Sequence, residues 1–279
     1  MRPKSGPMSG RKKGIATMRV LAGVVALAAA VGVSAQEAGP RLEPAPAHRL
    51  DMESLQRGAR NFANYCQTCH GAQYMRYNRL TDLGLSDKEI SENLMFSTDK
   101  IGSTMTSTIS KADGAAWFGT APPDLSVEAR VRGKDWLYSY LLAFYRDEKA
   151  ATGWNNLVFN NVSMPHVLWE RSGVQHLVET EYDDEEKAEA AVIAAKGLAV
   201  AERVNEHKYV VKTLAQEAPG TMQPVEYKAF VADLVNYLDY ISEPARNKRI
   251  NIGIGVLIYL GILLVFAYAL KRAYWEDVH

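Results

Sequence analysis

The residues with the clearest chemistry are Cys66, Cys69 and His70, which follow one another in the order C-x-x-C-H. Two thiols about one helical turn apart can each add to one vinyl group of a porphyrin, and the next residue can place its imidazole under the iron. The chain has no other cysteine, so a framework of structural disulfides is excluded. The motif therefore predicts covalent attachment of one c-type haem, with His70 as an axial ligand.

Two other uses of paired cysteines fit this sequence less well. A thioredoxin-like dithiol follows a strand in a βαβ unit, whereas the residues before Cys66 have helical spacing. A zinc site needs further ligands at ligand spacing, and the histidines beyond the motif are scattered along the chain. These histidines include His48, His166, His176 and His207.

The sixth ligand of the iron separates electron transfer from reaction with small molecules. Ligation by His and Met suits electron transfer, whereas an open position suits O₂ or peroxide chemistry. Met52 precedes the helix that leads into the motif and Met75 lies five residues beyond His70, so both are poorly placed to reach the opposite face of a haem. Spacing alone leaves four candidate methionines open, namely Met95, Met105, Met164 and Met222.

Two helices are expected to position the motif. The first starts after Asp51, a suitable N-cap, runs straight into the cysteines and ends at Gly71. The second covers Val225 to Ile241 and is closed by Pro244. Both show the spacing of an apolar helix face, with Leu55, Ala59, Phe62, Ala63 and Cys66 in one and Phe230, Leu234, Tyr237, Leu238 and Ile241 in the other.

Loops are expected to dominate the segment between these helices. Residues 71–126 contain no strand of convincing length and one short helix around Asp87 to Met95. A further helix is predicted over Gly133 to Phe144, followed by a loop from Arg146 to Pro165. The predicted fold class is mostly α, a cytochrome c-type domain with long loops over residues 50–249.

Residues 179–218 differ in composition and are interpreted as a surface insertion. The segment opens with an acidic run over 179–186 and continues through an Ala-rich helical stretch to about Arg203. The acidic run has two interpretations. It could steer a basic cytochrome c toward the protein, or it could be the acidic first turn that a helix dipole favours.

Two apolar segments mark the ends of the chain. Val20 to Val33 follows a basic stretch and precedes Val33-Ser34-Ala35, so residues 1–35 are predicted to be a secretory signal peptide, followed by an extended lead-in over 36–49. A two-part mitochondrial presequence is the alternative.

Ile250 to Leu270 contains no charge and, at about 1.5 Å per residue, is long enough to cross a membrane. If the signal peptide exports residues 36–249, the C-terminal span stops the transfer and residues 271–279 remain in the cytoplasm.

The distribution of charge argues against binding of nucleic acid. The whole chain has 32 basic and 32 acidic residues, but residues 1–35 contain six basic residues and no acidic one. The remaining chain therefore has a formal net charge of −6. Nucleic-acid binding needs clustered Lys and Arg to displace counterions from phosphate, so we exclude it.

Several motifs in this order resemble the cytochrome c1 family, whose members belong to the cytochrome bc1 complex. The resemblance covers about residues 45–275 and ends with a C-terminal membrane anchor. It rests on Cys66 to His70, Ala121 to Ser126, Asn161 to Pro165, Thr221-Met222 and Ser242 to Pro244.

The resemblance implies roles for individual residues. Met164 would be the axial ligand opposite His70, whereas Met222 would not bind iron. Pro122 and Pro123 would line the haem pocket, and either Arg130 or Arg132, with Arg132 favoured, would meet a haem propionate. The resemblance also implies that the first and last soluble helices cross, with Gly58 and Phe62 of one against Leu234 and Tyr237 of the other.

The resemblance also implies a function. The expected protein is a redox subunit rather than a complete enzyme, anchored in the bacterial inner membrane with its haem domain on the periplasmic side. It would associate with cytochrome b, accept one electron from a Rieske iron-sulfur protein and pass it to a cytochrome c. The alternatives are a haem peroxidase or reductase with an open sixth position and a membrane-anchored cytochrome c subunit of another respiratory complex.

Overall fold

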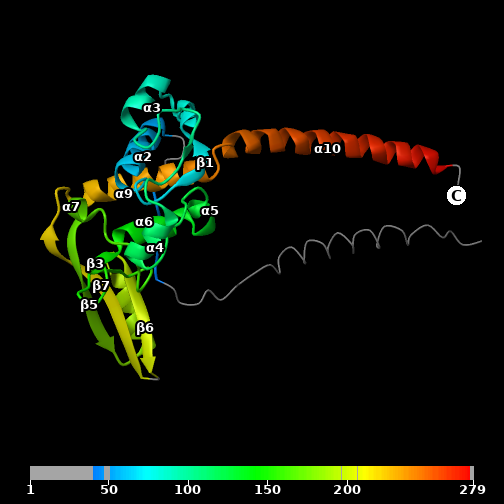
Figure 1. Ribbon diagram of the computed structural model, residues 1–279. Helices are drawn as coiled ribbons and strands as arrows, with labels where there is room; N and C mark the ends of the chain where they lie inside the picture. The colour runs from blue at the N-terminus through cyan, green and yellow to red at the C-terminus, as the bar shows by residue number, and fades with distance from the viewer. Residues whose placement is uncertain (1–39, 47–50, 196, 206, 277–279) are drawn as a thin grey trace, which may run out of the picture. The chain divides into compact units, whose positions relative to one another are not determined.

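The computed structural model describes residues 40–46, 51–195, 197–205 and 207–276 (Figure 1). The predicted signal peptide lies outside the described residues, as do residues 36–39 and 47–49 of the lead-in, residue 50, and residues 277–279 of the tail. The helices are α2 Met52–Tyr65, α3 Asp87–Asn93, α4 Lys111–Phe118, α5 Glu128–Val131, α6 Lys134–Leu142, α7 Trp169–Ser172, α8 Glu185–Ala194, α9 Pro224–Ser242 and α10 Arg246–Tyr274, with a 3₁₀ helix η1 Tyr77–Leu83. The strands are β1 Ala72–Arg76, β2 Thr104–Met105, β3 Phe144–Arg146, β4 Trp154–Asn156, β5 Gly173–Tyr182, β6 Ala199–Asn205 and β7 Lys208–Pro219.

Helices α2 and α9 pack against each other through the centre of the hydrophobic core. Asp51 caps α2 as expected, since its side chain accepts a hydrogen bond from the Ser54 backbone N–H. Gly58 is required at the crossing because a Cβ there would lie 2.2 Å from the Asp233 carbonyl oxygen. The rings of Phe62 and Tyr237 pack with centroids 5.7 Å apart, so the predicted crossing of the two helices is confirmed.

Short elements and loops connect α2 to α6, much as the sequence predicts. The expected helix near Asp87 is α3, which has a capping box between Ser86 and Glu89. The prediction that 71–126 contains no strand of convincing length is wrong for β1, a five-residue strand that pairs with β2. Because β2 is only two residues long, its sequence carries too little alternation to be recognised.

The helix predicted over 133–144 is α6, which ends two residues earlier. Phe144 instead starts strand β3, which pairs in antiparallel register with β4 inside the predicted loop 146–165. Residues 40–46 have no helix or strand and are tied to α6, because the backbone N–H groups of Glu43 and Ala45 donate to side chains of Ser139 and Asp135.

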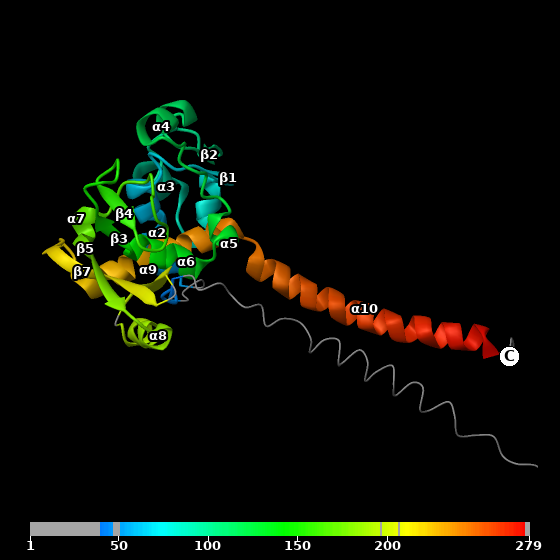
Figure 2. The same cartoon turned by 90° about the horizontal axis from the view of Figure 1, so that it is seen from below.

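The predicted helix running to about Arg203 is wrong, because this region is mainly a sheet. Strands β5, β7 and β6 form an antiparallel sheet in that order, and helix α8 ends at Ala194. The sheet and α8 lie at one end of the domain, with α3 at the other (Figures 1 and 2). Ala188 of α8 packs with Tyr209 and Val211 of β7 in a small separate cluster. Pairing with the Val-rich β7 therefore overrides the helical preference of the Ala-rich sequence after α8.

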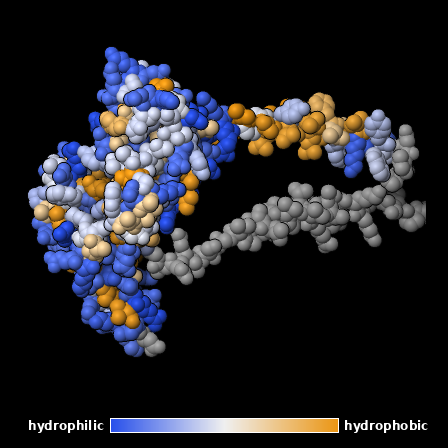
Figure 3. Space-filling view, in the orientation of Figure 1, coloured by the Kyte–Doolittle hydropathy of each residue, from blue (hydrophilic) through white to orange (hydrophobic). Residues whose placement is uncertain are grey.

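Helix α10 contains the predicted membrane span. Within its segment Lys248–Tyr274, the most apolar 18-residue stretch has a mean hydropathy of 2.5, and none of that stretch is buried in the structure. Among the described residues it is the one helix long and apolar enough to cross a membrane. Figure 3 shows apolar residues concentrated on this helix, whereas hydrophilic residues cover much of the visible face of the domain.

Candidate functional site: a cavity between a C-x-x-C-H turn and a methionine loop

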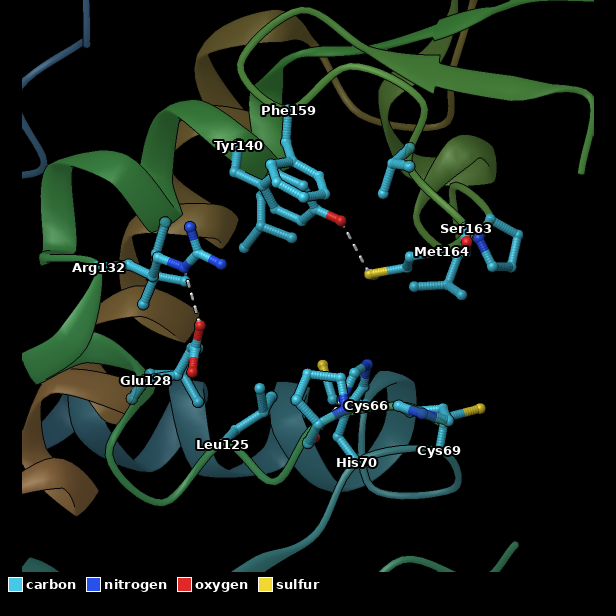
Figure 4. Close-up of a pocket in the computed structure, with 18 of the residues that line it drawn as sticks. Cys66, Cys69, His70, Leu125, Glu128, Arg132, Tyr140, Phe159, Ser163 and Met164 are labelled. Atoms are coloured by element: carbon cyan, nitrogen blue, oxygen red, sulfur yellow. Dashed lines mark hydrogen bonds and ion pairs between the residues drawn. The ribbon is translucent and has the colours of Figure 1, made fainter. Parts of the chain in front are cut away.

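A largely apolar cavity of about 280 Å³ lies between two walls that are far apart in sequence. We call residues 66–70 with Pro122 and Pro123 the attachment wall, and residues 159–167 the loop wall. Figure 4 shows Cys66 and His70 on one side of the cavity and Met164 on the other. Other lining residues come from α6 and α9 and include Trp136, Leu137, Tyr140, Leu141, Leu234 and Leu238.

The attachment wall is a set of tight turns that follows α2. The helix ends at Tyr65, earlier than the predicted end at Gly71. The Cys66 carbonyl then accepts hydrogen bonds from the N–H groups of Cys69 and His70, at 3.1 and 2.8 Å. These local turns bring both cysteines and the histidine of the motif to the cavity.

The chemistry of the two thiols does not match a redox dithiol. Burial, with a smaller effect of the nearby Cys69, raises the pKa of Cys66 to about 12. Burial also raises the pKa of Cys69. A reactive dithiol needs a lowered pKa, so the electrostatics disfavour a redox dithiol. Among the described residues, moreover, His, Cys, Asp and Glu form no group of three that could hold a metal ion.

His70 is oriented by the turn that contains the two prolines. Its Nδ1 lies 2.8 Å from the Pro123 carbonyl oxygen, so Nδ1 carries the proton and donates it, which leaves Nε2 free to bind a metal. Burial lowers the pKa of His70, although the hydrogen bond to Pro123 opposes this shift, and the neutral ring that a metal requires is favoured. The turn is fixed in its place because the Leu125 N–H donates to the Gly71 carbonyl at 2.7 Å.

The loop wall carries Met164 into the cavity. The Tyr140 hydroxyl donates a hydrogen bond to Met164 Sδ at 3.4 Å, as Figure 4 shows. The loop before Met164 is held by Asn155, whose Oδ1 accepts from the N–H of Asn161, a residue with φ of 57°. After Met164, His166 is buried and its Nε2 lies 2.8 Å from Ser172 Oγ.

The other candidate methionines do not line the cavity. Met105 is fully buried in the main core, and its sulfur accepts a hydrogen bond from Tyr237. Met95 and Met222 pack against the same core from its edge. Of the methionines that the structure describes, Met164 is therefore the one that lines the cavity, across from His70.

The two candidate arginines differ in position. Arg132 lines the cavity, with its guanidinium 4.8 Å from the Trp136 ring centroid and its Nε 3.3 Å from Glu128. Arg130 does not line the cavity. The pKa of Glu243 is lowered mainly by its hydrogen bond with Arg249, and the charge of Arg130 also lowers it. The geometry thus favours Arg132 for a contact with a group in the cavity.

Three aromatic residues of the site were not singled out as site residues from the sequence. Trp136 and Tyr140 stack with ring centroids 4.9 Å apart, and Phe159 packs edge-on against Trp136. The four-residue spacing of Trp136 and Tyr140 on a predicted helix gives a signal for a shared face. Phe159 has no such signal, because it lies in a loop far from α6 in sequence.

The donor set fits a c-type haem. A thiol pair with an adjacent imidazole lies on one wall, a thioether on the other, and the space between them is largely apolar. Nitrogen and thioether sulfur on opposite faces are the axial ligands of electron-transfer cytochromes.

Comparison with known proteins gives a consistent result. Residues 43–278 match the Cytochrome C1 family. The chain is 43% identical over 239 residues to the ammonia monooxygenase gamma subunit of Nitrosomonas europaea, covering 86% of this chain and 89% of the relative. It is 40% identical over 254 residues to cytochrome c1 of Allochromatium vinosum, covering 91% and 96%. It is also 29% identical over 262 residues to cytochrome c1 of Rhodospirillum rubrum, covering 82% and 84%.

Proposed function

Since the chain belongs to the cytochrome c1 family, we propose that it is a membrane-anchored electron-transfer subunit with one haem c attached through Cys66 and Cys69. His70 and Met164 are the proposed axial ligands. The observation that carries the proposal is the position of Met164, whose thioether enters the cavity opposite the C-x-x-C-H turn. When bound, the haem supplies reversible one-electron chemistry.

The residues of the chain bind, orient and shield that group. Pro123 fixes the tautomer of His70, and Tyr140 fixes the thioether of Met164. The leucines of α6 and α9 keep water from the cavity, and a low-dielectric surrounding with few polar groups is one of the ways in which a protein sets a haem potential. One-electron transfer requires no proton donor or acceptor at the site.

The proposed partners follow from the family. Relatives named cytochrome c1 support membership of a cytochrome bc1 complex with cytochrome b and a Rieske iron-sulfur protein. In this role the chain accepts one electron from the Rieske protein and passes it to a cytochrome c. Purification of the complex in mild detergent tests the assignment. Co-purification of a cytochrome b and a Rieske protein is expected, and their absence would contradict it.

We also propose that the haem domain faces the periplasm of a bacterium. The signal peptide predicted over residues 1–35 would export the domain, and the span within α10 would leave residues 271–279 in the cytoplasm. Protease added to intact spheroplasts should then digest the haem domain and spare a tag fused after His279. Digestion of the tag in intact spheroplasts would indicate the opposite orientation.

The ligand assignment has a direct test. Met164→Leu should lower the reduction potential and allow the reduced protein to bind CO, since the ligand that favours reduced iron is lost. Met105→Leu and Met222→Leu are matched controls and should change neither property. An unchanged potential in Met164→Leu would show that another group occupies the sixth position. CO binding by the unmodified protein would support the alternative of a peroxidase or reductase.

A second candidate function is supported by one relative. The 43% identity to a protein named ammonia monooxygenase gamma subunit supports a cytochrome subunit of a different membrane complex. The haem site would be the same in both cases, so spectra cannot separate them. Co-purification of monooxygenase subunits in place of a cytochrome b and a Rieske protein would favour this candidate.

A further inference from the structure

The Tyr140 side chain contacts Met164, the proposed ligand, through its hydroxyl group. Its hydroxyl lies 3.4 Å from Met164 Sδ, and both side chains line the cavity. A phenol O–H is a good donor, and a thioether sulfur is a weak acceptor. The contact is therefore a hydrogen bond made to the atom that would bind the iron.

The position of this hydroxyl is fixed from three sides. The Tyr140 ring stacks on Trp136 at 4.9 Å with an angle of 10° between the planes. Its other neighbour, Phe144, packs edge-on at 5.1 Å. The Tyr140 carbonyl accepts a hydrogen bond from Asn156 Nδ2 at 2.8 Å, which ties the end of α6 to strand β4. Packing of this kind limits the rotamers of Tyr140 and keeps the hydroxyl directed at the loop wall.

We propose that Tyr140 is a positioning residue that tunes the Met164 thioether through its hydrogen bond to Sδ and thereby raises the reduction potential of the site. The proposal rests on the proposed function, because it requires Met164 to be an axial ligand. A donated hydrogen bond withdraws electron density from sulfur and weakens its donation to iron. Oxidised iron depends more on that donation than reduced iron does, so the bond favours the reduced state.

A second tyrosine and methionine pair provides a matched control. The Tyr237 hydroxyl lies 3.5 Å from Met105 Sδ in the core between α9 and β2. Neither residue lines the cavity. Tyr237→Phe therefore removes the same kind of hydrogen bond from a sulfur atom that is not a proposed ligand.

The experiment compares Tyr140→Phe with Tyr237→Phe in the full-length holoprotein. Tyr140→Phe should lower the midpoint potential, by less than Met164→Leu does, and Tyr237→Phe should leave it unchanged. The weak charge-transfer band of thioether bound to oxidised iron should persist in Tyr140→Phe, and the reduced protein should not bind CO. In the Met164→Leu background, adding Tyr140→Phe should produce no further shift, because the sulfur is absent.

Two results would overturn the proposal. One is that Tyr140→Phe and Tyr237→Phe have the same midpoint potential, so that loss of the hydrogen bond to Met164 causes no shift of its own. The other is loss of the thioether band with binding of CO, which would show that Tyr140 only holds the loop in place. Failure of the proposed function has a different signature, since Met164→Leu itself would then leave the potential and the band unchanged.

Discussion

The two walls of the cavity are built in different ways. In the attachment wall, the groups proposed to hold the haem lie within five consecutive residues after α2 and short hydrogen bonds set their backbone, while the Pro123 carbonyl contacts the His70 ring. In the loop wall, Met164 depends on contacts with residues distant in sequence, such as Tyr140, 24 residues earlier. A change in packing should therefore affect the two proposed axial ligands unequally, with His70 the more resistant and Met164 the more sensitive.

The largest expected effect comes from the attachment wall. Cys66→Ala or Cys69→Ala removes one of the two proposed covalent links, and the haem is expected to be part of the core of this loop-rich domain. The yield of folded protein should fall severalfold, and not only its redox activity. Thr68→Ala, within the same motif, is the control and should give a normal yield. Normal amounts of folded, haem-free protein from either cysteine variant would contradict the expectation.

The next effect concerns the helix that carries the attachment wall. A Cβ at Gly58 would lie 2.2 Å from the Asp233 carbonyl oxygen and 2.6 Å from the Tyr237 Cβ. Gly58→Ala should destabilise the protein by about 1–3 kcal/mol or more, because α2 and α9 must move apart. Gly102→Ala meets nothing within 4 Å and should change stability by less than about 0.5 kcal/mol.

Urea unfolding of both glycine variants measures these effects. The folded fraction of Gly58→Ala should retain the potential of the wild type, because the turns that set the motif are local. A changed potential in that variant would show that the helix crossing also shapes the cavity.

The contrast between the walls also explains what the sequence could and could not predict. The C-x-x-C-H turn is contiguous, and the apolar faces of α2 and α9 repeat with a helical period, so these features are visible in a single chain. Met164 could not be separated from three other methionines by spacing, because its position depends on folding of the whole loop. The family resemblance singled it out, and the cavity now gives a geometric reason.

The β5, β7 and β6 sheet shows a different failure of sequence reasoning. Ala and Glu after residue 184 have high helical propensity, and α8 follows that propensity as far as Ala194. Beyond this point the cross-strand pairing of Ala199 to Asn205 with β7 determines the structure. Such pairing is not encoded within the segment itself. The acidic run is used both ways: Asp184 caps α8 and Asp183 pairs with Lys187, whereas Glu179 and Glu181 of β5 pair with Lys212 and Lys208 of β7.

A smaller effect is expected from the buried histidine of the loop wall. Burial lowers the pKa of His166 to about 3, well below the value of about 6.5 for an unfolded chain. Below pH 6.5 the unfolded chain therefore binds a proton that the folded protein excludes. The stability present above pH 6.5 should be lost by roughly 1 kcal/mol for each pH unit as the pH falls toward 3.

The comparison of wild type with His166→Gln checks this expectation. Urea unfolding between pH 7.5 and 5 should give a weaker pH dependence for the variant, because glutamine does not titrate. Equal pH dependence in the two proteins would show that His166 is protonated in the folded state or that other groups dominate.

The smallest expected effect separates the two arginines. The Arg132 guanidinium lines the cavity, but its side chain is 44% exposed and paired with Glu128, so solvent and the carboxylate weaken its field. A positive charge near the iron favours the reduced state, so Arg132→Gln should lower the potential slightly and Glu128→Gln should raise it. Arg130→Gln, which changes an arginine outside the cavity lining, should have less effect than either. The Arg132 shift should shrink between 0.01 and 0.15 M salt, as the Debye length falls from about 30 to about 8 Å. A larger shift from Arg130→Gln would instead assign the contact with the haem propionate to Arg130.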